Sequence, residues 1–235
     1  MEIYKLKDEV PEGRRGRTGA EGRRKGALDM GESGGILRVT EMKSGVRNPE
    51  RVNVYVNGKY ALSLDVVQVV DYHLKVGMVL SAEKLGELRK ASEFGVAYQR
   101  ALEWVLMRPR SEREARDYLR KKIYEKKLDG GYVDEIMVRL KSKKYLDDYR
   151  FAEFWVENRF VKKGVSRKRL EIELKNKGVK QEIIEEVLSG RSDEEEVRKM
   201  IGRKRKKYDN EKLIAYLCRQ GFSYDLVRRL VEESD

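Results

Sequence analysis

The residues whose types and spacing come nearest to a catalytic site are four carboxylates in YLDDYRFAEFWVENR, residues 145–159. Asp147 and Asp148 are adjacent, and Glu153 and Glu157 lie one helical turn apart. Carboxylates gathered in this way can hold Mg²⁺ for phosphodiester hydrolysis, so a metal-dependent nuclease is one interpretation. The others are an acidic interaction surface and a helix start with a packed face behind it.

The helix-start interpretation accounts for these residues without a metal. Asp147 or Asp148 can accept a backbone N–H at the first turn, where the helix dipole also favours negative charge. Glu153 follows Arg150 by three residues, which is the spacing of an exposed ion pair. Apolar residues follow at helical spacing: Phe151, Ala152, Phe154 and Trp155. We therefore favour the capping role over a metal site.

Few other groups in the chain are suited to catalysis. The single cysteine, Cys218, and the single histidine, His73, cannot make a zinc site of the usual type. His73 also has no matched nucleophile or ligand cluster. No phosphate-binding loop of the Walker type occurs. We expect no enzyme activity, no catalytic residue, no bound metal and no cofactor.

Charge dominates the composition of the 235 residues. Charged residues make up 40% of the chain, well above the usual quarter, which favours an elongated helical protein. The net charge is +12 and the isoelectric point is about 9.5. This basic balance indicates a polyanionic partner, most plausibly nucleic acid, although a basic protein without such a partner is the plainer alternative.

The location of the protein follows from its cysteine content and its apolar segments. One cysteine cannot form an internal disulfide, which favours a reducing compartment. The N-terminal MEIYKLKDEV lacks the apolar centre of a signal peptide, and no stretch approaches about 20 uncharged apolar residues. We expect a cytoplasmic, monomeric protein without a membrane partner.

The first part of the chain divides into a tail and a small β-rich module. Residues 1–35 are rich in Gly and charge and have no helix or strand period, so we expect a disordered basic tail. In residues 36–92, alternating apolar residues flank Asn57–Gly58, a strong hairpin signal because both turn residues need positive φ. ILRVTEMK, residues 36–43, is expected as a third strand. A helix starting after Ser81 would help to cover the sheet.

From about residue 93 the sequence predicts helices in a threefold repeat. Each copy has a capping residue followed by apolar residues at steps of four: Ser111, Ala115, Leu119 and Ile123; Ser166, Leu170 and Leu174; Asp209, Leu213 and Leu217. Gly178 and Gly221 then supply left-handed residues that end the helix. Flanking helices complete three-helix units at 93–146, 147–190 and 191–235. The fold class is therefore mainly α, with three tandem three-helix repeats in an elongated array, preceded by a small β-hairpin module.

The motif at the start of the second unit carries a resemblance. YLDDYRFAEFWVENRF, followed by KKGVSRKRLEIELKNKGV, resembles the central motif of the RecX family of bacterial recombinase regulators. The resemblance covers about residues 97–235, and the β-rich module resembles an N-terminal extension of some members. It implies a protein that lies along the groove of the RecA filament. Such a protein limits filament growth, ATP hydrolysis and strand exchange, in homologous recombination, DNA repair and the SOS response.

Exposed basic residues are the candidates for contact with the recombinase or with single- or double-stranded DNA. They gather in KKGVSRKRLEIELKNKGVK, residues 162–180, and in RKRKK, residues 203–207. The predicted contact residues are Arg150, Arg159, Lys162, Lys163, Arg167, Lys168, Arg169, Lys175, Arg203, Lys204, Arg205, Lys206 and Lys207. For any one of them an ordinary solvated helix face is a comparable interpretation.

Two further groups have binding and packing interpretations. A third basic cluster surrounds Pro109: Arg108, Arg110, Arg113 and Arg116. Trp104 and Trp155 lie on apolar faces and are expected to anchor the core rather than stack on bases. An alternative function is a stand-alone DNA-binding protein, because three-helix units resemble helix-turn-helix modules.

Overall fold

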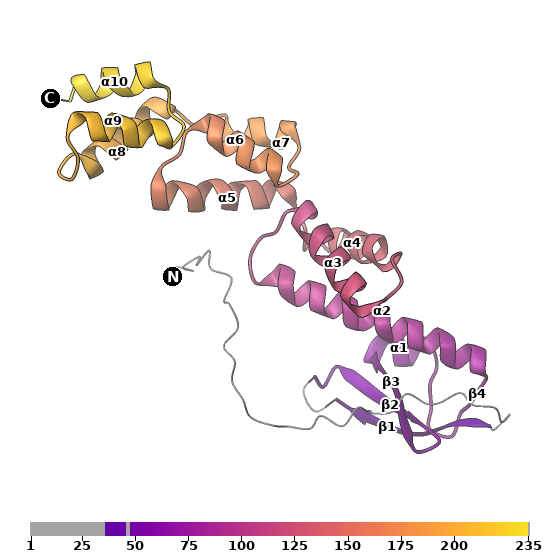
Figure 1. Ribbon diagram of the computed structural model, residues 1–235. Coiled ribbons are helices and arrows are strands. Elements are labelled where there is room, and N and C mark those ends of the chain that lie inside the picture. Colours follow the sequence, from indigo (N-terminus) through magenta and orange to yellow (C-terminus); the bar gives the residue numbers. More distant parts are fainter. Residues whose placement is uncertain (1–35, 46–47, 235) are drawn as a thin grey trace.

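The computed structural model describes residues 36–45 and 48–234, with the backbone alone for residues 160–163. Within these residues lie four strands and ten helices (Figure 1). The sheet occupies one end of the molecule, and the helical units follow one another away from it to the C-terminus. The predicted tail, residues 1–35, lies outside the described part of the chain. The predicted fold class, mainly helical with a small N-terminal sheet, is confirmed.

The sheet is antiparallel with the strand order β3-β2-β1-β4. Its strands are β1 (Leu37–Ser44), β2 (Arg51–Val56), β3 (Lys59–Asp65) and β4 (Val79–Leu80). Asn57 and Gly58 join β2 to β3 with φ of 49° and 76°, as the hairpin signal requires. The alternating residues Val54 and Leu62 face each other in the register and are buried. Strand β4 was not predicted, because two residues show no period.

A short and a long helix cover the buried face of the sheet. Helix α1 (Val66–Asp71) follows β3, and α2 (Ala82–Leu106) begins after Ser81, whose side chain caps it as predicted. Leu85 and Leu88 of α2 belong to the core under the sheet. The same helix continues for 25 residues into the core of the first helical unit. The predicted border between the module and the first unit therefore lies inside one continuous helix.

Eight further helices follow in the described residues. They are α3 (Glu112–Lys126), α4 (Tyr132–Ser142), α5 (Asp148–Lys163), α6 (Arg167–Asn176), α7 (Gln181–Leu188), α8 (Asp193–Lys204), α9 (Asn210–Arg219) and α10 (Tyr224–Glu232). They form three separate cores. The first joins the second half of α2 to α3 and α4, the second joins α5, α6 and α7, and the third joins α8, α9 and α10.

The residues of the predicted repeat lie where the pattern placed them. All seven apolar residues of the stripe are buried: Ala115, Leu119, Ile123, Leu170, Leu174, Leu213 and Leu217. The side chains of Ser111, Ser166 and Asp209 each accept the backbone N–H three residues later, which caps α3, α6 and α9. The middle helix of each unit is thus fixed by one polar cap and one apolar stripe.

Candidate binding surface of the helical units

The adjacent carboxylates of the second unit have two different functions. Asp147 Oδ1 accepts the backbone N–H groups of Tyr149 and Arg150 at 2.9 and 3.2 Å, so Asp147 caps its own helix, α5. Asp148 Oδ1 accepts the N–H of Glu112 at 2.8 Å, and Glu112 is the first residue of α3 in the preceding unit. One aspartate therefore begins a helix, and the other joins two units.

The junction between the second and third units repeats this contact. Asp193, the first residue of α8, accepts the N–H of Arg167, the first residue of α6, at 2.7 Å. In both junctions a carboxylate at the start of one unit satisfies an unpaired amide at the start of the preceding middle helix. Burial raises the pKa of Asp148 above its ordinary value, although the hydrogen bond from Glu112 opposes this.

The described part of the chain offers no cluster suited to a metal ion. No group of three or more His, Cys, Asp or Glu side chains comes together within residues 36–45 and 48–234. Asp147 directs its oxygen atom to backbone amides of its own helix, as the helix-start interpretation requires, whereas Asp148 directs its oxygen atom to an amide of the preceding unit. The geometry gives these carboxylates structural roles.

Two glycines mark a second contact between units. Gly178 and Gly221 have φ of 81° and 96°. A Cβ atom on Gly178 would lie 2.8 Å from Cβ of Arg113, and one on Gly221 would lie 2.6 Å from Oγ of Ser166. The end of each middle helix therefore abuts the start of the middle helix in the preceding unit. This places the partly negative end of one helix dipole beside the partly positive end of the next.

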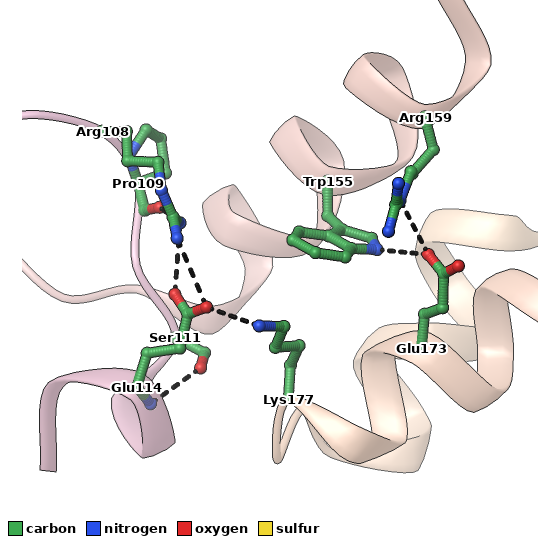
Figure 2. Close-up of polar contacts among 8 residues, drawn as sticks. All are labelled: Arg108, Pro109, Ser111, Glu114, Trp155, Arg159, Glu173 and Lys177. Atoms are coloured by element: carbon green, nitrogen blue, oxygen red, sulfur yellow. Dashed lines mark hydrogen bonds and ion pairs between the residues drawn. The ribbon is translucent and has the colours of Figure 1, made fainter. Parts of the chain in front are cut away.

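A network of charged side chains and Trp155 connects the first two units (Figure 2). Glu114 of α3 pairs with Arg108 at 3.2 Å and with Lys177, which follows α6, at 2.8 Å. The ammonium of Lys177 lies 5.0 Å from the centre of the Trp155 ring. Trp155 Nε1 in turn donates to Glu173 at 3.0 Å. The network thus runs from the loop before α3 through α6 to α5.

Known proteins are similar to this chain in sequence and in architecture. A family model described as "Regulatory protein RecX N-terminal domain" matches residues 38–81, and one described as "RecX, second three-helix domain" matches residues 147–188. The regulatory protein RecX of Bacillus licheniformis is 30% identical over 207 residues, covering 84% of this chain and 77% of that protein. The chain belongs to the RecX family. The RecX protein of Listeria monocytogenes is 28% identical over 208 residues, covering 84% and 76%.

The RecX fold is also found among solved structures. A crystal structure of regulatory protein RecX superimposes with a TM-score of 0.63 at 20% identity, covering 83% of this chain and 99% of that one. The resemblance drawn from the motif at residues 145–180 is thus confirmed. The relatives are named as regulatory proteins, and a regulatory role follows for this RecX chain. No helix of the described residues combines the length and apolar character that crossing a membrane needs.

Several predicted contact residues of this RecX chain make bonds within the protein. Arg159 and Arg169 both pair with Glu173, at 3.0 and 3.5 Å, and Lys175 pairs with Glu171 at 2.8 Å. Lys204 and Arg205 are partly buried and lie against other residues of the third unit: Tyr216 for Lys204, and Asn210, Val231 and Ser234 for Arg205. Folding therefore uses part of the predicted basic surface.

The remaining predicted contact residues whose side chains the structure describes face solvent. The exposed set consists of Arg150, Arg167, Lys168, Arg203, Lys206 and Lys207. Lys162 and Lys163 end α5, and their side chains lie outside the described part. The exposed members are spread over the second and third units, at the start of α5, the start of α6 and the end of α8.

The cluster around Pro109 is more internal than its charges suggest. Arg108 pairs with Glu114, and Arg116 pairs with Asp134 of α4. The guanidinium of Arg110 lies 3.9 Å from the centre of the Trp104 ring, and the other contacts of that ring include a stack with Tyr118 at 4.3 Å. Arg113, by contrast, lies beside Gly178 at the contact between the first two units.

Both tryptophans are partly buried against the unit cores, and both also contact cations. Trp104 packs on the first core and Trp155 on the second, as expected of core anchors. Arg110 covers the first ring, whereas Arg159 and Lys177 lie 4.9 and 5.0 Å from the centre of the second. Sequence reasoning missed these cation–π contacts, since the cations lie several residues away or in another helix.

Proposed function

We propose that this chain regulates a RecA-type recombinase by binding along the recombinase filament on single-stranded DNA. In this proposal it limits filament growth, ATP hydrolysis and strand exchange, and it performs no catalysis itself. Membership of the RecX family supports the regulatory part. The resemblance to recombinase regulators supplies the partner.

The repeated junction is the observation that carries the proposal. The carboxylate–amide contact occurs at both borders, Asp148 with Glu112 and Asp193 with Arg167. Because both borders between units are held by the same kind of contact, the three units form one extended body and do not move independently. A body of this kind can contact several filament subunits at once. Binding that favours one filament state then shifts the population toward that state.

Charge complementarity supports the same partner. The exposed basic residues lie in successive units, with Arg167 and Lys168 in the second and Lys206 and Lys207 in the third. An acidic groove or a line of phosphates would meet these charges along the array. A compact ligand would contact only a few of these basic residues. The distribution therefore favours a long polar partner.

The alternative of a stand-alone helix-turn-helix protein is weakened by the second unit. In such modules the helix after the turn enters the major groove. Helix α7 stands in this position, because Gly178 makes the turn after α6. It carries Glu182, Glu185 and Glu186 and no Lys or Arg. Three carboxylates facing DNA phosphates would repel them, so we favour the recombinase.

The proposal is tested with the DNA-dependent ATPase of RecA. We expect the full chain, at amounts stoichiometric with RecA, to lower the steady-state rate on single-stranded DNA. A Lys168→Glu/Lys206→Glu variant should lower it less, whereas Glu182→Gln should act like the wild type. Light scattering or electron microscopy of the filaments would show whether growth is limited as well. An unchanged ATPase at stoichiometric wild-type protein would contradict the proposal.

A further inference from the structure

The structure contains a basic cavity at the joint of the first two units that the proposed function leaves unexplained. Its volume is about 280 Å³. Val105 and Leu106 contribute apolar walls from the end of α2, and the polar lining comes from the two connecting segments: Arg108, Arg110, Lys144, Tyr145, Asp147 and Arg150. Figure 2 shows Arg108 and Pro109 on the first of these segments, above the start of α3.

We propose that this cavity binds a phosphate group of single-stranded nucleic acid, with the adjoining base placed on Tyr145. The proposal deepens the proposed function, on which its biological setting rests, because it names a contact with the nucleic acid of the filament. Of the predicted contact residues the cavity includes Arg150, and it also includes Arg108 and Arg110 of the predicted cluster around Pro109.

Positive charge in the cavity exceeds negative charge. Four cationic side chains line it, and Arg108 alone among them pairs with a carboxylate of the described residues, Glu114. Asp147 is the single acidic member of the lining, and it already accepts two backbone amides at the start of α5. Arg110, Lys144 and Arg150 therefore leave an excess of positive charge, which an anion would neutralise.

Arg110 is held in a position that favours a bound anion. Its Nε is buried and has no hydrogen-bond partner in the described part of the chain. Burial, and next the neighbouring charge of Arg108, lower the pKa of Arg110 to about 10. The ring of Trp104 holds its guanidinium plane at 3.9 Å. The guanidinium fork matches the oxygen atoms of a phosphate or of a carboxylate.

Lys144 reaches the cavity from a backbone conformation that lysine rarely adopts. Its φ is 58°, in the left-handed region that Gly or Asn usually occupies at the end of a helix. A lysine in this position costs stability relative to glycine without improving the helix end.

The aromatic residue at the rim favours nucleic acid over an acidic protein partner. Tyr145 lines the cavity and leaves 39% of its surface exposed, and Leu106 beside it leaves 62% exposed. A nucleotide offers both a phosphate for the cations and a base for the ring, and base–aromatic stacking is a common mode of single-strand binding. An aspartate or glutamate side chain would use the cations alone.

The test measures binding of the full chain to a fluorescent oligo(dT) by anisotropy, without recombinase, over a range of salt concentrations. The pocket variant Lys144→Gln/Arg150→Gln is compared with Lys121→Gln/Lys126→Gln. The control loses the same charge on α3, at positions about 13 and about 21 Å from the start of that helix at 1.5 Å per residue. A third variant, Tyr145→Ala, is measured against oligo(dT) and against an abasic oligomer of equal length. Circular dichroism checks that each variant is folded.

We expect the pocket variant to bind oligo(dT) at least tenfold more weakly at low salt. The slope of log affinity against log salt should fall by about 0.7 for each phosphate that the variant no longer binds. Tyr145→Ala should weaken oligo(dT) binding about tenfold and leave the abasic oligomer unaffected. The control should stay close to wild type. Equal losses in pocket and control variants would overturn the proposal, because the binding would then be general electrostatics.

A competitor distinguishes the two kinds of partner. Poly-glutamate of the same charge should displace oligo(dT) poorly. Displacement at equal charge concentration, with the same dependence on Lys144 and Arg150, would overturn the proposal in favour of an acidic protein ligand. Since recombinase is absent from this assay, its outcome is independent of the ATPase result. A result that contradicts the cavity proposal can therefore be distinguished from one that contradicts the filament proposal.

Discussion

At the scale of single residues, many charged side chains of this protein form ion pairs with other residues of the same chain. Glu114 is an example, because its side chain is only 15% exposed and receives both Arg108 and Lys177. Burial acts to raise the pKa of Glu114, but the hydrogen bonds from Lys177 and Arg108 outweigh it, and the pKa lies below its ordinary value. A strongly basic chain can therefore present fewer free cations than its composition indicates.

Glu114→Gln should destabilise the protein by about 2 kcal/mol, because it leaves two cations without their shared counter-charge. Urea unfolding at pH 7 measures this. The exposed pair Arg228–Glu232 supplies the control, and Glu232→Gln should cost less than about 0.5 kcal/mol. Equal effects of the two substitutions would show that the network adds nothing at the joint.

The effect of Glu114 should also depend on pH. Because its folded-state pKa is depressed, the stability that it contributes is present above its unfolded pKa, about 4.3. That stability is lost as the pH falls through the folded-state value. The difference in melting temperature between wild type and Glu114→Gln should therefore be full at pH 6 and shrink toward pH 3. A constant difference over this range would contradict the assignment.

Asp148 should behave differently from Glu114, because burial raises its pKa. Asp148→Asn keeps an oxygen for the N–H of Glu112 and removes a partly buried charge. It should stay within about 0.5 kcal/mol of wild type at pH 7, whereas Asp148→Ala should lose about 1 kcal/mol, as for a lost helix cap. Chemical denaturation compares the two. Similar losses in both variants would show that the charge, and not the acceptor, matters.

At the scale of elements, the middle helices of the three units are arranged in line. The end of α9 contacts the start of α6, and the end of α6 contacts the start of α3. Ser166 donates its backbone N–H to the carbonyl of Gln220 at 3.2 Å, and the Arg169 side chain donates to the carbonyl of Arg219 at 2.8 Å. These donors satisfy carbonyls that the end of α9 would otherwise leave to water. The contact needs a close approach, which Gly221 allows in this junction and Gly178 in the other.

Gly178→Ala should destabilise the protein by about 1–2 kcal/mol, because the new Cβ meets Arg113 and the left-handed backbone disfavours a side chain. Gly86 serves as the control, because it lies inside α2 and a Cβ atom there would have nothing within 4 Å. Gly86→Ala should stabilise by about 0.5–1 kcal/mol. Thermal unfolding of both variants checks the opposite signs.

Local patterns of the sequence account for most of these elements. The stripes that include Leu119, Leu170 and Leu213, and the caps Ser111 and Ser166, are periodic within single helices, so they could be predicted. The contact of Asp148 with Glu112 could not, because it depends on how two units are placed. The pairing of Arg159 with Glu173 could not be predicted either, because it joins α5 to α6, whereas Arg169 lies four residues before Glu173 in one helix, a spacing that the sequence shows. The basic cavity joins segments that no motif connects.

At the scale of the whole molecule, the two junctions decide whether the array behaves as one body. Each has a carboxylate–amide bond, at Asp148 and Asp193, and a close glycine contact. The cores themselves are separate. The relative placement of the units therefore depends on a small number of polar contacts, while the folding of each unit does not.

Asp148→Ala/Asp193→Ala should loosen the array without unfolding the units. Spin labels on Arg120→Cys and Arg228→Cys, in a Cys218→Ala background, would report the distance between the first and third units. We expect a broader distance distribution in the double variant and unchanged helical content by circular dichroism. The proposed inhibition of the RecA ATPase should weaken in parallel. An unchanged distribution would show that the other contacts between the units hold the array without these two carboxylates.

The continuity of α2 has a consequence for the sheet at its far end. Since one helix belongs to both the module and the first unit, each residue inserted near Ser92 would rotate the sheet by about 100° and move it by about 1.5 Å. Seven inserted residues would bring it back to within about 20° of its original direction. The length of α2 thus determines the orientation of the sheet relative to the first helical unit. In the proposed complex it would set which side of the filament the sheet faces while the helical units stay in place.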